Sequence, residues 1–246
     1  MKLSLKSSAA ALLILSSSSG MCASVADIAF VIDQSGSMGS EFNWLSSSIE
    51  TINQRVSDAG ITARYAVAGY ERDFGSNGDD RNIYQDFSSD ITDITNATTD
   101  VNTYGGNEYS YNAAVDGTTG FAWSDSAVRV MILITDERSP QSGDNYSESE
   151  VGDIMSDGDF LLNVIAPSRF QENWDDAAYS TDNYLGFFDL DLLRDDPETF
   201  TTRLTEAKIE EIINQPSPVP LPAAFWLFAT GLLGLFGFKR NSRSTT

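Results

Sequence analysis

The chain has 246 residues, enough for one sizeable domain with short appendages. It carries 36 acidic residues against 15 basic ones, a formal net charge of −21, so its field opposes binding to the phosphates of nucleic acids. The chain has no histidine and one cysteine, Cys22, which excludes serine–histidine catalysis, cysteine–histidine catalysis and an internal disulfide.

The N-terminus has the features of a secretory signal peptide. Two lysines, Lys2 and Lys6, precede an apolar run over residues 9–15, and small residues follow before the expected cleavage site. We therefore expect signal peptidase to remove residues 1–24, together with Cys22, and the remaining chain to be exported.

Strand-like and helix-like segments alternate over residues 25–214, which is typical of an α/β domain. The expected strands cover about residues 27–32, 64–70, 82–87, 127–135, 160–166 and 185–190. The expected helices cover about residues 40–59, 90–101, 109–121, 147–155, 171–178 and 196–214. The second and third strands should form a hairpin, and the very apolar fourth strand should be central. The predicted fold is a doubly wound, mostly parallel sheet flanked by helices, plus a C-terminal hydrophobic helix.

A polar loop follows the first expected strand. Asp33, Ser35 and Ser37 place three oxygen donors at alternate positions, and Gly36 loosens the backbone between them. Oxygen donors on a flexible turn suit Mg²⁺, Ca²⁺ or Mn²⁺ better than zinc or copper. The alternative is an ordinary polar turn between a strand and a helix, with a serine cap.

The central strand 127–135 also ends in a carboxylate, Asp136. In a doubly wound sheet, residues just beyond the carboxyl ends of neighbouring parallel strands converge in one crevice. Asp136 should therefore meet Asp33, Ser35 and Ser37, and the four residues predict a site for a divalent cation that also keeps some water ligands.

Three segments together resemble a von Willebrand factor A (VWA) domain. They are Asp33-Gln-Ser-Gly-Ser37 after its apolar strand, the Gly105-Gly106 loop, and Ile132-Leu-Ile-Thr-Asp136. The resemblance covers about residues 25–214 and implies a VWA/Rossmann-like fold with a metal-ion-dependent adhesion site.

In such a site the resemblance implies that Ser35 and Ser37 ligate the ion directly, while Asp33 and Asp136 bind it directly or through water. Mg²⁺ is the expected ion, with Ca²⁺ and Mn²⁺ as alternatives. An open coordination position accepts an acidic group of the ligand, which implies a binding module and no enzyme.

The second loop departs from the family pattern, which places a threonine ligand shortly after the glycine pair. Here residues 103–110 read Thr-Tyr-Gly-Gly-Asn-Glu-Tyr-Ser, and we expect Glu108 to replace the threonine, with Asn107 or Thr103 as the alternatives. A carboxylate there would favour retention of the cation but weaken the ion's attraction for an acidic ligand. The other interpretation of Glu108 is a carboxylate that interacts with a helix N-terminus.

Composition changes sharply after the last expected helix. Residues 215–222 form a proline-rich linker, residues 223–238 are apolar and uncharged, and residues 239–246 are basic. This order predicts a transmembrane segment at 223–238 with a cytoplasmic basic tail.

The same tail, with Val219-Pro-Leu-Pro-Ala-Ala followed by the apolar run and basic residues, resembles a PEP-CTERM sorting signal of the VPLPA variety. The resemblance implies a precursor held in the inner membrane of a Gram-negative bacterium and cut by an exosortase, so that the domain reaches the cell surface or extracellular matrix. A permanent single-span anchor is the alternative.

These observations predict an exported module that captures a protein or polysaccharide ligand bearing an acidic group through a divalent cation. One alternative is a metal- or carboxylate-assisted hydrolase of extracellular glycans, for which Asp136 and Glu137 are the nearest carboxylate pair. Another is a structural matrix protein in which the ion only stabilises the fold.

Overall fold

A computed structural model describes residues 24–71, 82–99, 101, 103, 105–106, 108–178 and 186–215. Its six-stranded sheet has the order β3-β2-β1-β4-β5-β6, in which β3 alone runs antiparallel to its neighbour. The strands are β1 (Ser24–Asp33), β2 (Ile61–Tyr70), β3 (Asn82–Ser88), β4 (Val128–Ile134), β5 (Phe160–Ala166) and β6 (Phe187–Asp189). The predicted mostly parallel sheet and the β2–β3 hairpin are therefore confirmed.

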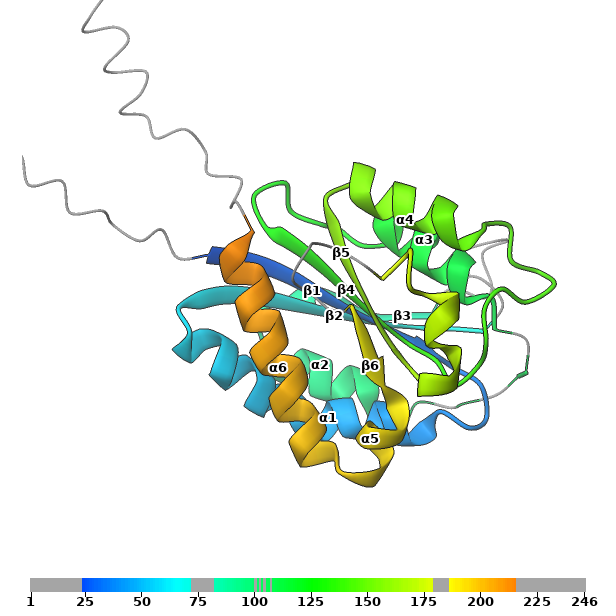
Figure 1. Cartoon of the computed structure of the whole chain (residues 1–246). Helices are drawn as coiled ribbons and strands as arrows, with labels where there is room; N and C mark the ends of the chain where they lie inside the picture. The colour runs from blue at the N-terminus through cyan, green and yellow to red at the C-terminus, as the bar shows by residue number, and fades with distance from the viewer. Residues whose placement is uncertain are drawn as a thin grey trace, which may run out of the picture.

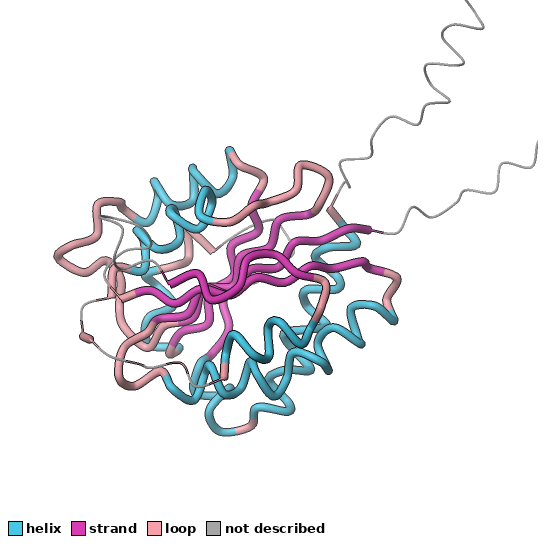
Figure 2. Tube along the Cα trace, turned by 180° about the vertical axis from the view of Figure 1, so that it is seen from behind, coloured by secondary structure: helices cyan, strands magenta, loops and turns pink. Residues whose placement is uncertain are grey.

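Helices cover both faces of the sheet, as Figures 1 and 2 show from opposite sides. On one face lie α1 (Gly39–Asp58), α2 (Ile91–Thr98), α5 (Leu190–Asp195) and α6 (Pro197–Asn214). On the other face lie α3 (Ser110–Gly120) and α4 (Glu148–Asp157). A 3₁₀ helix (Ser168–Asn173) follows β5.

The sheet separates two hydrophobic cores, one on each of its faces. In β1, Ile28, Phe30 and Ile32 face the core beneath α1 and α6, whereas Ala29 and Val31 face the core beneath α3 and α4. All five are at most 2% exposed, as expected for a strand buried on both faces. The small alanine on the second face leaves room for the helices there to approach closely.

The strand register brings the two predicted polar loops to one edge of the sheet. Ile32 of β1 pairs with Ile134 of β4, and Asp33 pairs with Tyr70 of β2. The loops that follow β1 and β4 therefore begin side by side, although about a hundred positions separate them in the sequence. The candidate site lies at this carboxyl edge, as expected for a doubly wound sheet.

The last third of the fold differs from prediction at two places. The short helix expected at 171–178 is a 3₁₀ helix that covers residues 168–173. The predicted strand 185–190 contains only the three residues of β6, because Asp189 caps a helix, α5, by accepting a hydrogen bond from the Asp191 backbone N–H.

A second cap separates α5 from α6. Asp196 accepts a hydrogen bond from the Thr199 N–H, and Pro197 occupies the first turn of α6. The caps at Asp189 and Asp196 thus produce a short helix, α5, that the sequence did not predict, directly before α6, which matches the predicted helix at 196–214.

The predicted leader, the Pro-rich linker, the apolar segment 223–238 and the tail 239–246 fall outside the described residues, apart from Ser24 and Gln215 at their borders. Within the described ranges, none of the helices combines the length and apolar character needed to span a bilayer.

Candidate metal centre

The structure brings four predicted site residues together at the carboxyl edge of β1 and β4. The Ser35 and Ser37 hydroxyl oxygens lie 3.1 Å apart, and Ser37 Oγ donates a hydrogen bond of 3.1 Å to Asp136 Oδ1. The Ser35 backbone N–H donates to Asp33 Oδ1 at 2.7 Å. The side-chain oxygens of Ser35, Ser37 and Asp136 form a continuous chain, and Asp33 is bonded to the backbone of Ser35 at one end of it.

Asp33 is a fully buried carboxylate next to this chain of oxygens. Besides the Ser35 N–H, it accepts a 2.9 Å hydrogen bond from the Thr135 hydroxyl. Burial raises the pKa of the Asp33 carboxyl from 3.8 to about 7, and Glu108 adds to this rise, while the hydrogen bonds oppose it. A nearby cation would stabilise the ionised form of this carboxylate.

Glu108 provides a second buried carboxylate close to the others. It is 1% exposed, and its Oε1 has no hydrogen-bond partner among the described residues. Burial is the main reason why its pKa rises to about 6, and the charges of Glu137 and Asp136 raise it further. A buried oxygen without a donor is costly in a folded protein, and a metal ion is one group that would satisfy it.

The two alternatives to Glu108 have different outcomes. Thr103 lies close to Gly39, the first residue of α1. Its Oγ1 is 3.8 Å from the position that a Cβ atom on Gly39 would occupy. Asn107 lies outside the described residues. Both Thr103 and Glu108 therefore lie near the loop that carries Ser35 and Ser37.

Arg194 is a site residue that the sequence did not predict. From α5, its Nη2 donates to Asp136 Oδ2 at 3.0 Å and to the Ser37 carbonyl at 3.4 Å, and its Nε donates to Glu41 Oε1 at 2.7 Å. Glu41 itself is buried at the start of α1. One guanidinium therefore links both predicted metal loops to α1 and offsets two negative charges.

Thr135 was also missed, although its position beside Asp136 at the end of a buried strand is a readable signal. Arg194 had no such signal, because it is 58 positions from its partner Asp136 and belongs to a helix that was not predicted.

The donor set suits a hard divalent cation. Within the described part of the chain, no three Asp, Glu, His or Cys side chains gather closely enough to hold an ion by themselves. A metal centre here must therefore include the hydroxyls of Ser35 and Ser37 as well as the carboxylates. Oxygen-only ligation with few charges, completed by water, is typical of Mg²⁺ sites.

We expect Arg194→Gln to tighten Mg²⁺ binding roughly fivefold to tenfold, because it removes a positive charge bonded to Asp136, an effect of about 1 kcal/mol for a partly exposed pair. The same change should destabilise the metal-free protein by about 2 kcal/mol, because Glu41 stays buried without its cation. Calorimetric Mg²⁺ titration and urea unfolding in EDTA measure the two effects.

Arg203→Gln on the exposed surface of α6 removes the same charge away from the site, and it should alter neither quantity. Weaker Mg²⁺ binding by Arg194→Gln would contradict the assignment of Arg194 as a competitor for Asp136.

Comparisons with solved structures place the fold among known proteins. Proximal thread matrix protein 1 from the mussel byssus matches with a TM-score of 0.54 and 17% identity, over 76% of this chain and 47% of that one. The pilus adhesin SpaC from Lactobacillus rhamnosus GG matches with a TM-score of 0.55 and 14% identity, over 77% of this chain and 31% of that one. The chain thus spans less than half of either protein, and at these identities the likeness establishes the fold alone.

Comparison with family models identifies two segments. Residues 218–241 match the PEP-CTERM protein-sorting motif, which supports export, and residues 27–179 match the von Willebrand factor type A domain. A search of curated proteins finds no match. The match to the von Willebrand factor type A model extends from β1 past the end of β5 and covers more than half of the chain. The protein therefore belongs to the von Willebrand factor type A domain family.

Proposed function

We propose that this protein is an exported binding module that captures an acidic protein or polysaccharide ligand through a divalent cation, with Mg²⁺ as the expected ion. The observation that carries the proposal is the continuous chain of Ser35, Ser37 and Asp136 oxygens, with 3.1 Å between successive atoms. Buried carboxylates of Asp33 and Glu108 adjoin this chain. Hydroxyl and carboxylate oxygens are suitable ligands for a divalent cation, and a cation would stabilise the ionised form of the buried carboxylates.

In this proposal Ser35 and Ser37 hold the ion directly, and Asp136 holds it directly or through water. Asp33 accepts hydrogen bonds from Ser35 and Thr135, so it holds the serine loop in place. Its negative charge also attracts the ion. Glu108 offers its partnerless Oε1 as the replacement for the missing threonine. A bound ion supplies an open coordination position for a carboxylate of the ligand.

The proposed location is the cell surface or extracellular matrix of a Gram-negative bacterium. The sorting motif at residues 218–241 supports an inner-membrane precursor that an exosortase cuts. The similar solved structures include a pilus adhesin and a thread matrix protein, which is in keeping with an adhesive or matrix role. The adjacent pair Asp136 and Glu137 gives little support to a glycan hydrolase, since Ser37 and Arg194 already engage both oxygens of Asp136.

The test is capture of matrix components from the producing organism by the full-length protein. Wild type should capture acidic polysaccharide or protein in Mg²⁺ and lose it in EDTA, and Ser35→Ala should lose capture in both conditions. Ser57→Ala, an exposed serine on α1, is the matched control and should behave as wild type. Methyl esterification of the carboxyl groups in the extract should abolish capture.

Capture that persists in EDTA, in Ser35→Ala or after esterification would refute recognition through the metal. If Mg²⁺ raises the thermal stability of wild type but no carboxylate-dependent capture occurs, the ion only stabilises the fold, and the structural matrix role replaces the adhesive one.

A further inference from the structure

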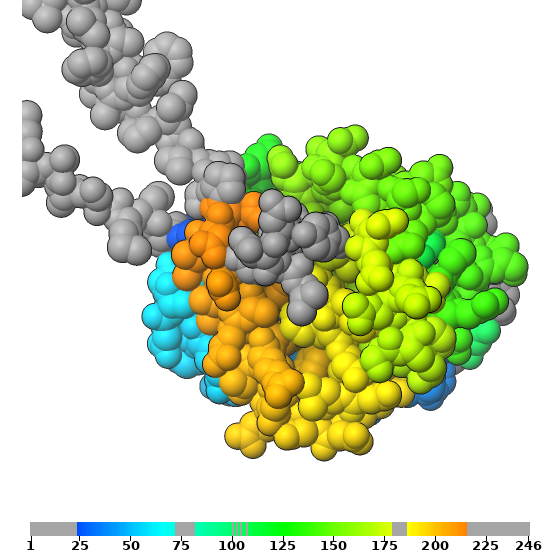
Figure 3. Space-filling view, in the orientation of Figure 1, coloured from blue at the N-terminus to red at the C-terminus, as the bar shows by residue number. Residues whose placement is uncertain are grey.

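Lys208 is the only lysine between residues 24 and 215, and it is buried. Its exposed fraction is 3%, although lysine is almost never fully buried in proteins unless it is paired. It lies on the inner face of α6, a helix that runs along the surface beside α5 (Figure 3). Its Nζ lies 5.4 Å from the centroid of the Phe188 ring. Ile28, Phe30 and Ile132 line a cavity of about 10 Å³ beside it.

The Lys208 amine contacts a carboxamide and a carboxyl group. Nζ contacts Oδ1 of Asn163 on β5 and Oε2 of Glu211, one turn further along α6. Glu211 Oε2 also lies 3.5 Å from Asn163 Nδ2, which in turn donates to the Leu161 carbonyl at 3.3 Å. Asn163 and Glu211 are both 0% exposed. The amine, the amide and the acid therefore form a closed group shielded from water.

This environment favours an uncharged amine. Desolvation lowers the pKa of Lys208, although the neighbouring Glu211 opposes that effect. Glu211 lies in contact with the amine, where its carboxylate can accept a proton and return it. An uncharged lysine amine is a nucleophile, and here it already touches the oxygen of the Asn163 amide group.

We propose that Lys208 and Asn163 join through an amide bond between α6 and β5, with Glu211 as the catalytic acid and base. Lys208 Nζ attacks Asn163 Cγ, and the Cγ–Nδ2 bond breaks. Glu211 accepts one proton from Nζ and passes one to the departing Nδ2, so that it ends in the protonation state in which it began. The products are one amide cross-link and one ammonia molecule, and the reaction requires neither an oxidant nor a further reactant.

The cross-link has a mechanical consequence. α6 is the last described helix, and the sorting segment at residues 218–241 follows it in the chain. Tension applied to the C-terminal end would pass from Lys208 directly into β5 of the sheet. Without the bond, the same load would rest on the noncovalent packing of α6, such as the contact of Leu204 with the core. The bond is independent of the metal centre and of its ligand.

Intact mass of the denatured full-length protein, purified from the cells that make it, tests this proposal. The wild-type mass should fall short of the sum of its residues by one ammonia molecule. Trypsin should leave the chain uncut after Lys208, and fragmentation should find a branched peptide that joins Lys208 to Asn163. An amine-reactive label should leave Lys208 unmodified even after denaturation.

Two neighbouring glutamates provide a matched comparison. Glu211→Gln removes the acid and should restore the full mass, whereas Glu210→Gln, an exposed residue next to it, should retain the loss of ammonia. A wild-type protein of full mass whose Lys208 reacts with the label would overturn the cross-link, whatever the variants do. A cross-link that persists in Glu211→Gln would overturn the catalytic role of Glu211.

Discussion

Replacing Asp33 by asparagine should stabilise the metal-free protein at about pH 8 and abolish its response to Mg²⁺. The carboxyl of Asp33 is fully buried, and its pKa rises from 3.8 to about 7, mainly because of burial. Ionising it in the folded protein therefore costs up to about 4 kcal/mol relative to the unfolded chain. Asparagine keeps the shape and an acceptor for the Ser35 N–H but carries no charge.

The sign of the pH dependence follows from the direction of the shift. Between pH 3.8 and about pH 7 the folded protein binds a proton at Asp33 that the unfolded chain has released. Acidification through this window should therefore stabilise the metal-free wild type. Above the folded-state pKa, the buried charge destabilises the folded protein by its full amount. Glu108, whose pKa rises to about 6, contributes in the same direction.

Urea unfolding in EDTA at about pH 8 and about pH 5 measures this effect. Wild type should be more stable at the lower pH, and Asp33→Asn should show a much smaller difference. Asp58→Asn, at the exposed end of α1, is the control and should resemble wild type. In Mg²⁺ at one hundred times its Kd, wild type at the higher pH should gain about 2.7 kcal/mol, and Asp33→Asn should gain far less. Loss of wild-type stability on acidification would contradict the buried carboxylate.

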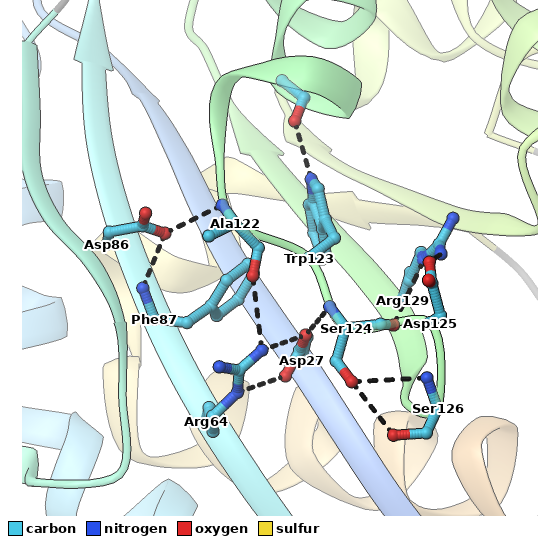
Figure 4. Close-up of polar contacts among 11 residues, drawn as sticks. Asp27, Arg64, Asp86, Phe87, Ala122, Trp123, Ser124, Asp125, Ser126 and Arg129 are labelled. Carbon is cyan, nitrogen blue, oxygen red and sulfur yellow. Dashed lines mark hydrogen bonds and ion pairs between the residues drawn. The ribbon is translucent and has the colours of Figure 1, made fainter.

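The second large effect concerns an ion pair between the buried Asp27 and the partly exposed Arg64, near the amino ends of the parallel strands (Figure 4). Asp27 of β1 is 0% exposed and accepts hydrogen bonds from Arg64 Nε at 2.8 Å and Nη2 at 2.6 Å. The Ser124 N–H donates a third, at 2.7 Å. Arg64 also lies 5.1 Å from the centroid of the Phe87 ring and packs against it. Removing the arginine would leave a buried carboxylate with one donor.

Arg64→Leu should destabilise the protein by about 2–3 kcal/mol, below the 3–5 kcal/mol typical of a broken buried pair, because 36% of the Arg64 side chain is exposed. Adding Asp27→Asn to Arg64→Leu should recover most of that loss, since the stranded charge is then removed. A double-mutant cycle by urea unfolding measures the coupling between the two residues.

Arg129 of β4 provides the matched control. It also lies over a phenylalanine ring, 5.4 Å from the centroid of Phe160, but its partner Asp125 is fully exposed to solvent. Arg129→Leu should therefore cost less than about 1 kcal/mol. Equal losses for Arg64→Leu and Arg129→Leu would show that the ring contacts, and not the burial of Asp27, determine the effect.

The sequence by itself determined the order of the strands and of the main helices, and the position of the candidate centre. Continuous apolar runs marked β1 and β4 as strands buried on both faces, and each run ended in an aspartate, Asp33 or Asp136. Because parallel strands align their carboxyl ends, these two local signals were enough to place distant residues in one site. Asp33, Ser35 and Ser37 form their loop through contacts two residues apart, which local sequence specifies.

Tertiary structure alone decided which side chains surround these positions. Arg194 reaches Asp136 only because the caps at Asp189 and Asp196 turn the chain into a separate helix, α5. Lys208 meets Asn163 only because α6 docks on the sheet with that face inward. Burial and long-range contacts depend on how the helices pack on the sheet. The residue type at one position does not specify which distant residue will contact it.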